Sequence, residues 1–599
     1  MVALASNLES AGELALVAAV RERFAAHALY TDVCPGVVLF TNPHSWVGSA
    51  ELYGSDSVRR YCAAGAAAGD DLPPHVFAIA ERAYRKAALR LFALCDDEEL
   101  QADQSILISG ESGTGKTETL KLTIGFLAAA SGASGPPGAS AAGGAGHTIS
   151  IAISATNPLL EAFGNARTLR NDNSSRFGKH VALSFGRRSH ACALVRAELR
   201  MYMLERSRVT SPAADERSFH IFYQLLAGGR ALGVGPDPGA VSEALASTLR
   251  HLFGAEADGG VGLPTDPSAY PSLRLSGCYT ISGVNDGEAL ERTVAAMALT
   301  GVEADGVRVV LSVVATALTL CGAACAFVAR ADGEEGATLA GEEGRRWLRA
   351  AARLLGLVDG GGADGGGGLE EEETGAYAEE AEDSSDWEEA KWAAADWEEA
   401  GGEALAPSHA AGAGSPTPAA LADSAAAALL AQLLRRRIRV GADDQTITLR
   451  LSPQQAADGA RALAKALYAR LFDFLLARAN AELSGSGEQQ QAARDLALGA
   501  GAPRESRSSL SLAPAPLAPA AVGAAERLAC IGLLDLFGFE CFGKGRDGFE
   551  QLCINYANER LQANFAADVL VSQQQEYEAE GVPWLKVALD ADGTIPNYI

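Results

Sequence analysis

The segment GESGTGKT at Gly110–Thr117 decides how this chain folds. The apolar stretch Ser105–Ser109 precedes it and is typical of a buried strand, and Glu118–Leu127 follows it with a composition that favours a helix. A strand, a glycine-rich loop ending in GK[ST] and a helix form a phosphate-binding loop, in which backbone N–H groups and the positive end of the helix dipole face the phosphates. The sequence therefore predicts an α/β fold with a central, mostly parallel, twisted sheet flanked by helices.

The phosphate-binding loop also predicts which residues contact a nucleotide. Lys116 is placed to reach the β and γ phosphates, and the Thr117 hydroxyl is placed to bind Mg²⁺. Such a loop by itself indicates a nucleotide and leaves the chemistry open. The residues predicted to contact the nucleotide here are Gly110, Glu111, Ser112, Gly113, Thr114, Gly115, Lys116 and Thr117.

Two later segments carry side chains suited to the same ligand. Asn157–His180 is rich in Asn, Ser, Thr and Arg, which is too polar for a core element and suits a loop that lines a charged ligand. Leu528–Leu534 is a predicted buried strand that ends at Asp535, so a carboxylate lies at the strand tip where the water shell of a metal would be. Gly538, three residues later, permits a close backbone approach to a γ phosphate.

Together these segments resemble the myosin motor domain. GESGTGKT is similar to the myosin P-loop, NDNSSRFGK at Asn171–Lys179 resembles switch I, and DLFGFE at Asp535–Glu540 resembles switch II. Kinesins also have a P-loop and an SSR triplet, but here the triplet continues with Phe-Gly and the second switch reads FGFE, which disfavours a kinesin. Further characteristic stretches are Pro73–Arg85, Glu216–Gly228, Ser276–Ala289 and Phe549–Gln562.

The resemblance implies a P-loop NTPase motor over residues 1–590, with a helical upper subdomain beside the sheet. ATP and Mg²⁺ are the implied ligands, ATP hydrolysis is the implied reaction, and the actin filament is the implied partner. The implied location is the cytoplasm, at the cytoskeleton.

The resemblance also implies roles for individual residues. Ser174 and the backbone of Gly538 would lie beside the γ phosphate and the attacking water, and Arg176 would form a salt bridge with Glu540 when switch II closes. The implied metal ligands are Thr117, Ser175 and, through a water, Asp535, and the implied phosphate contacts include Lys116, Asn171 and Asn173.

An adenine contact is implied for Asn42, Pro43 and Tyr53. The family pattern NPxxxxxxY places its tyrosine three residues earlier than Tyr53. Either a small insertion separates the two parts of the pattern, or the contact with the adenine ring is altered.

Charge and hydropathy exclude some functions. The net charge of −26 argues against nucleic acid as a partner, because neutralising phosphates requires clustered Lys and Arg. Asp364–Glu403 holds sixteen acids and one lysine, a local net charge of −15. The most apolar stretch, Val309–Ala326, is broken by Gly322, and the N-terminus has no basic region before a long apolar run. No transmembrane segment is expected, and the cytosol is the expected compartment.

Three stretches rich in Gly, Ala, Pro or Ser are predicted loops or disordered insertions: 128–146, near the nucleotide site, 359–425, which is acidic, and 484–522. The middle one repeats DWEEA at Asp386–Ala390 and Asp396–Ala400. Two interpretations remain open for it: a docking segment for a basic partner, or a solvated spacer of low complexity.

Two further segments resemble coupling elements of the family. Leu433–Leu451 resembles the hairpin with an actin-facing loop, whose regulatory position falls at Asp444 or Gln445. The apolar spacing of Phe549–Glu580 suits one long amphipathic helix, and by resemblance residues 547–585 correspond to the relay helix and loop of the family.

The sequence ends at Ile599, before the segments that would be a converter and lever arm, and it contains no IQ motif. We therefore expect no bound light chain or calmodulin. Two hypotheses follow: the ATPase motor domain of an actin-based motor, or a catalytically inert or regulatory nucleotide-binding interaction module derived from a myosin head.

Overall fold

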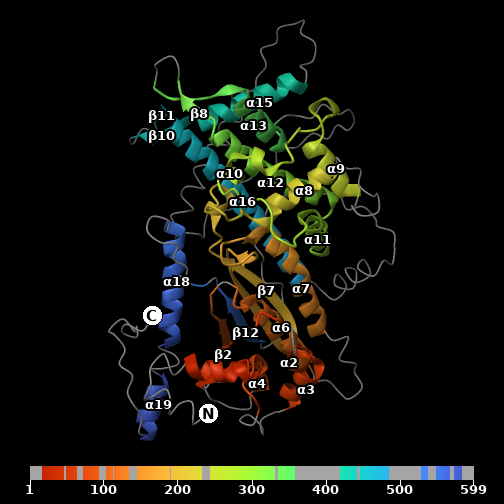
Figure 1. Ribbon diagram of the computed structural model, residues 1–599, viewed down its shortest axis with the longest axis vertical. Coiled ribbons are helices and arrows are strands. Elements are labelled where there is room, and N and C mark those ends of the chain that lie inside the picture. The colour runs from red at the N-terminus through yellow and green to blue at the C-terminus, as the bar shows by residue number, and fades with distance from the viewer. Residues whose placement is uncertain are drawn as a thin grey trace. The chain divides into compact units, whose positions relative to one another are not determined.

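The computed structural model describes residues 17–34, 36–45, 49–63, 72–92, 103–111, 113–133, 145–188, 191–232, 243–330, 335–357, 418–440, 445–484, 528–536, 538, 548–566 and 572–582 (Figure 1). The chain divides into two compact units. Unit 1 comprises Met1–Glu205, Arg292–Val302 and Asp473–Ile599, and unit 2 comprises Arg206–Glu291 and Glu303–Phe472.

A four-stranded sheet lies in unit 1 and has the order β3-β12-β6-β7. Its strands are β3 (Gln104–Ile108), β12 (Leu528–Asp535), β6 (Gly178–Arg188) and β7 (Ala191–Tyr202). β12 pairs in parallel with β3 and antiparallel with β6, which in turn pairs antiparallel with β7. The predicted mostly parallel sheet is therefore wrong for the described strands, which form a mixed sheet. The reason is local, because β6 and β7 follow each other in sequence and pair as a hairpin.

The core of unit 1 is built on β12. Ala529, Ile531 and Leu533 are at most 1% exposed, because β12 has a strand on each side and helices against it. Helices α4 (Val76–Phe92) and α6 (Lys116–Ala133) pack against β12, β3 and each other, and α7 (Ala145–Gly164) packs against α6 and β7. The strand, loop and helix order predicted around Gly110–Thr117 is present as β3, the loop and α6.

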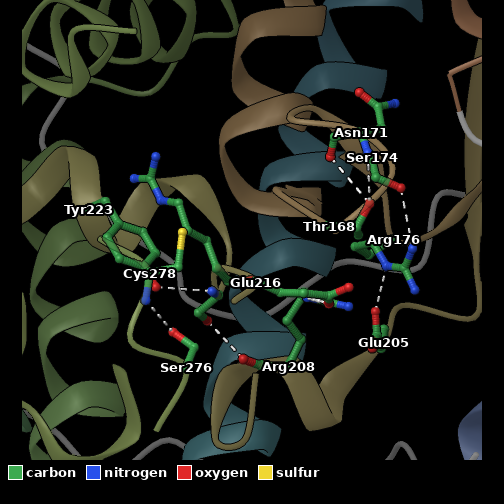
Figure 2. Close-up of polar contacts among 12 residues, drawn as sticks. Thr168, Asn171, Ser174, Arg176, Glu205, Arg208, Glu216, Tyr223, Ser276 and Cys278 are labelled. Atoms are coloured by element: carbon green, nitrogen blue, oxygen red, sulfur yellow. Dashed lines mark hydrogen bonds and ion pairs between the residues drawn. The ribbon is translucent and has the colours of Figure 1, made fainter. Parts of the chain in front are cut away.

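Unit 2 is mostly helical. α12 (Ala304–Ala324) packs against α8 (His220–Leu232), α9 (Glu243–Phe253) and α13 (Gly341–Leu354). α12 is long and apolar enough to cross a membrane by length and composition alone, yet 78% of that apolar window is buried inside the protein, as in a core helix. An ion pair is also buried in this unit, since Arg208 Nη1 lies 2.9 Å from Glu216 Oε2 and both side chains are at most 3% exposed (Figure 2).

The remaining described elements range from two-residue strands to the 32-residue helix α16. They are β1 (Tyr30–Cys34), β2 (Val37–Phe40), α2 (Ser49–Tyr53), α3 (Ser55–Ala63), β4 (Asn165–Ala166), β5 (Ser174–Ser175), α10 (Pro271–Arg274), α11 (Asp286–Leu299), β8 (Phe327–Ala329), β9 (Ala337–Leu339), α15 (Pro418–Leu433), β10 (Arg435–Val440), β11 (Gln445–Arg450), α16 (Pro453–Ser484), α18 (Phe549–Ala566) and α19 (Ser572–Glu580), with short 3₁₀ turns at Arg206–Val209, Glu256–Asp258 and Pro267–Ala269.

Two predicted insertions overlap helices. Residues 128–133 belong to α6, and residues 418–425 belong to α15. Alanine is frequent in both, and its high helix propensity, together with the burial of Ala128 and Ala425, explains why helix continues there. Apart from Ala145 and Gly146, which begin α7, the rest of these insertions and the third one beyond Ser484 lie outside the described residues.

The segment that resembles the relay helix contains two described helices, α18 and α19, and the residues between them lie outside the described part. Its apolar stripe is only partly buried. Ile554 is 4% exposed, whereas Phe549, Leu552 and Tyr556 are 79%, 64% and 62% exposed.

Candidate functional site

The loop between β3 and α6 turns its backbone through two glycines. Gly113 and Gly115 have φ values of 86° and 96°, a left-handed region that residues with a Cβ rarely adopt. Lys116, the first residue of α6, donates from Nζ to the carbonyl oxygens of Gly110 at 2.7 Å and Glu111 at 2.8 Å. The lysine is thus held over the loop by the loop's own backbone.

Asp535 lies beside the start of α6. Because β12 and β3 are parallel, their ends meet at one edge of the sheet, and Asp535 pairs in register with Ile108, two residues before the loop. Thr117 Oγ1 donates to Asp535 Oδ2 at 3.2 Å. Burial raises the pKa of Asp535, and the charge of Lys116, the Thr117 hydrogen bond and the charge of Lys179 oppose that rise.

Gly538 contacts the phosphate-binding loop through backbone alone. A Cβ built on Gly538 would lie 2.6 Å from the oxygen of Gly110 and 3.2 Å from Cα of Glu111. A side chain would therefore force the two segments apart. The structure thus gives a steric reason for glycine at this position: a Cβ would clash with the backbone of the phosphate-binding loop.

The segment resembling switch I lies between α7 and β6 and is cross-linked by amide side chains. Asn165 Nδ2 donates to Asn173 Oδ1 at 3.0 Å, and Asn173 Nδ2 donates to Glu161 Oε2 at 3.2 Å. Asn171 Oδ1 accepts from the backbone N–H of Asn173 at 3.0 Å. These bonds hold the Asn side chains in place before a ligand binds.

Arg176 has a partner that the sequence did not indicate. Its side chain is 1% exposed, and Nε donates to Glu205 Oε2 at 2.6 Å while Nη1 donates to Ser174 Oγ at 3.2 Å (Figure 2). The backbone N–H of Glu205 also donates to the Arg176 carbonyl at 3.0 Å. Glu540, the partner implied by the family resemblance, lies outside the described residues.

Lys179 is a second residue of the site that we did not predict to have a role. It pairs in register with Asp535, and its Nζ donates to Asn157 Oδ1 at 3.0 Å. Burial lowers the pKa of Lys179 to about 8, and the nearby Asp535 and Glu161 oppose that shift. The lysine therefore supplies positive charge behind the Asp535 carboxylate.

The three segments line one cavity of about 300 Å³. Of the predicted site residues, the following line it: Asn42, Gly113, Gly115, Lys116, Thr117, Asn171, Asn173, Ser174, Ser175, Asp535 and Gly538. Glu118, Glu161 and Asn165 line it as well and were not predicted.

A second cavity, of about 210 Å³, shares Asn42, Gly115 and Glu118 with the first. Its wall contains Pro43, Tyr53 and the apolar side chains Leu29, Phe40, Leu52 and Leu122. The structure thus brings together all three residues expected at adenine. A polar cavity joined to an apolar one suits a ligand with a charged end and a flat apolar end.

Some predicted residues are placed elsewhere. Thr114 Oγ1 donates to the Glu111 carbonyl at 2.8 Å, and the exposed Glu111 carboxylate lies 3.4 Å from Arg170 Nη1. Gly110 meets Gly538 through its backbone, Arg176 lies behind Ser174, and Ser112 is outside the described residues.

The donor set fits a nucleotide with magnesium. Two hydroxyls, Thr117 and Ser175, and the Asp535 carboxylate are oxygen ligands of the kind Mg²⁺ prefers, while Lys116 and the loop N–H groups suit phosphate. Within the described residues no group of three or more His, Cys, Asp or Glu could hold a metal alone. Mg²⁺ is usually bound by one or two carboxylates together with substrate phosphates, and the Asp535 carboxylate lines this cavity.

Comparison with known proteins matches the chain to the family described as myosin head (motor domain) over residues 4–232 and 520–596. Myosin-3 of Arabidopsis thaliana is 30% identical over 565 residues, which is 94% of this chain and 34% of that protein. Unconventional myosin-Ic of Bos taurus is 30% identical over 572 residues, 96% of this chain and 38% of that protein. Myosin heavy chain IB of Acanthamoeba castellanii is 30% identical over 515 residues, 86% of this chain and 30% of that protein. The chain spans about a third of the length of these relatives.

Proposed function

The chain belongs to the myosin head family, and from that premise we propose that it binds and hydrolyses Mg-ATP as the catalytic part of an actin-based motor. The observation that supports this best is the convergence of three separated segments on one cavity. Lys116 and Thr117, Asn171 and Ser175, and Asp535 come from different parts of the chain and line the same space.

In the proposed mechanism, the chain positions ATP more than it reacts with it. Lys116 and the loop N–H groups would hold the β and γ phosphates, and Thr117, Ser175 and, through a water, Asp535 would hold Mg²⁺. Bound Mg²⁺ supplies neutralisation of the charge that develops on the phosphates during transfer to water. Asn171 and Asn173, tied to each other and to Glu161, orient the switch toward that charge.

The attacking water is proposed to lie between Ser174 and the backbone of Gly538. Arg176, buried and bonded to Ser174 Oγ, fixes the rotamer of that hydroxyl. We propose that Arg176 also pairs with Glu540 when switch II closes, which would couple closure of the site to hydrolysis. Asn42, Pro43 and Tyr53 are the proposed adenine contacts.

Actin is the proposed partner, and the cytoplasmic cytoskeleton is the proposed location. The alternative is a nucleotide-binding interaction module without turnover. The structure favours hydrolysis in one respect, since the hydroxyls of Thr117, Ser174 and Ser175, the Asp535 carboxylate and Gly538 all line one cavity.

Steady-state Mg-ATPase activity with and without filamentous actin tests the proposal, alongside binding of a fluorescent ATP analogue. We expect turnover that filamentous actin accelerates. Lys116→Ala should abolish nucleotide binding, whereas Lys465→Ala, on α16 within unit 2 and outside the walls of both cavities, should leave it intact. Tight ATP binding without turnover in either condition would favour the module.

A further inference from the structure

The hairpin of β10 and β11 in unit 2 has two chemically different faces. Residues directly opposite each other in an antiparallel pair share a face, and faces alternate along each strand. Register pairs Arg435 with Arg450 and Arg437 with Thr448, which gives the arginine face: Arg435, Arg437, Thr448 and Arg450. The other face carries Arg436, Ile438, Ile447 and Leu449.

On the β10 strand, the arginine face presents two guanidinium groups, Arg435 and Arg437, without an acidic partner among the described residues. All four of its side chains are exposed, and within the described part of the chain no ion pair joins Arg435 or Arg437 to an acid. Arg435 and Arg437 are neighbours on the same face of β10, and their like charges repel each other. An acidic occupant would remove that repulsion.

The chain itself carries such an occupant. Asp364–Glu403 has sixteen acids against one lysine, a net charge of −15, and contains Trp387, Trp392 and Trp397. Carboxylates bind guanidinium groups in bidentate pairs, and tryptophan is the best aromatic partner for a cation. Both residue types of this segment therefore suit arginine, which favours docking over a solvated spacer.

The connection is long enough for the two to meet. The acidic segment precedes α15, which leads directly into β10. The residues 404–417 that join them span up to about 46 Å when extended. The 16-residue α15 is about 24 Å long, so the acidic segment reaches the hairpin. Tethering at this distance gives an effective concentration of about 1 mM, enough to sustain weak charge pairing.

We propose that the arginine face of the β10–β11 hairpin is the docking surface of the chain's own acidic segment, Asp364–Glu403. The segment then excludes other acidic surfaces from this face for as long as it is docked. Docking does not depend on whether the chain hydrolyses ATP.

Modification of arginines by phenylglyoxal, read by mass spectrometry, tests the proposal on the full chain. The comparison variant has every Asp→Asn and Glu→Gln within Asp364–Glu403, so that its length and tryptophans are kept. Arg435 and Arg437 should react about fivefold or more slowly in the native chain, because docking desolvates them. Arg436 is exposed on the opposite face and serves as the internal control, with the same rate in both proteins.

Salt and dilution provide the second measurement. In about 1 M NaCl, where the screening length is about 3 Å, the native chain should lose its protection. Protection should not change on dilution, since the occupant is tethered. Equal rates for Arg435 and Arg437 in the two proteins would overturn the proposal, as would protection that disappears on dilution, which would identify a second copy as the occupant.

Discussion

Replacing Glu205 by Gln tests whether the carboxylate that holds Arg176 is needed for hydrolysis. The substitution keeps the side-chain size and one acceptor oxygen and removes the charge. Two unit charges about 4 Å apart interact by about 4 kcal/mol at an effective dielectric constant of about 20. The neutral amide oxygen of Gln recovers about 1 kcal/mol of that interaction energy, which leaves a loss of about 3 kcal/mol. Because the Glu205 side chain is 16% exposed, solvent screening lowers the expected loss to about 2 kcal/mol.

Losing this interaction energy changes the position of Arg176 in the site. Arg176 is 1% exposed and cannot regain its solvation, so its guanidinium should shift and release Ser174 Oγ. If the full 2 kcal/mol is lost from the transition state, the hydrolysis step slows by about 30-fold. Nucleotide binding should change little, because Lys116 and its loop are untouched.

Single-turnover quench-flow measures the hydrolysis step, and a fluorescent ATP analogue measures binding. Glu198→Gln is the control: this carboxylate lies on β7 and pairs with Arg200 at 2.9 Å, but it is 30% exposed, and surface pairs contribute little. We expect wild-type rates for it. Unchanged hydrolysis in Glu205→Gln, or equal losses of binding and hydrolysis, would refute the assigned role.

Three further predictions concern the switches and stability. Arg176→Glu or Glu540→Arg should each abolish hydrolysis with nucleotide binding kept, and unchanged phosphate release by either variant would contradict the latch. Gly538→Ala places a Cβ 2.6 Å from the Gly110 oxygen, so hydrolysis measured by quench-flow should fall about 30-fold or more while binding persists. Burial lowers the pKa of His75 to about 4, so its contribution to stability is present above pH 6.5 and is lost as the pH falls toward 4, by up to about 3 kcal/mol. His75→Gln should flatten that part of the pH dependence of thermal unfolding, and an unchanged slope would contradict it.

The parts of the site that are local in sequence could be predicted. The loop at Gly110–Thr117 needs only its own glycines, the strand before it and the helix after it, and all three are visible in the sequence. Asp535 was predictable for a similar reason, because a carboxylate that directly follows a buried strand lies at the sheet edge.

The Arg176 and Glu205 pair could not be predicted in the same way. The two residues are separated by β6 and β7, and they meet because that hairpin returns the chain to its starting edge. No spacing rule in the sequence identifies such a pair, since its register depends on an irregularity between Ser184 and Phe185.

The helical ends of the insertions were missed for another reason: alanine-rich sequence is compatible with both a helix and a spacer, and burial decides between them.

The mixed character of the sheet, which the sequence did not indicate, is what brings the three segments together. Parallel pairing puts the end of β12 beside the end of β3, so Asp535 lies next to the phosphate-binding loop. Switch I precedes its strand instead of following it, so only an antiparallel β6 could start at that same edge, where Lys179 pairs with Asp535. A parallel β6 would carry switch I to the opposite end of the sheet, about 25 Å away over eight residues. The antiparallel strand is therefore a requirement of the site, because it is the arrangement that lets a segment before one strand and segments after two others line one cavity.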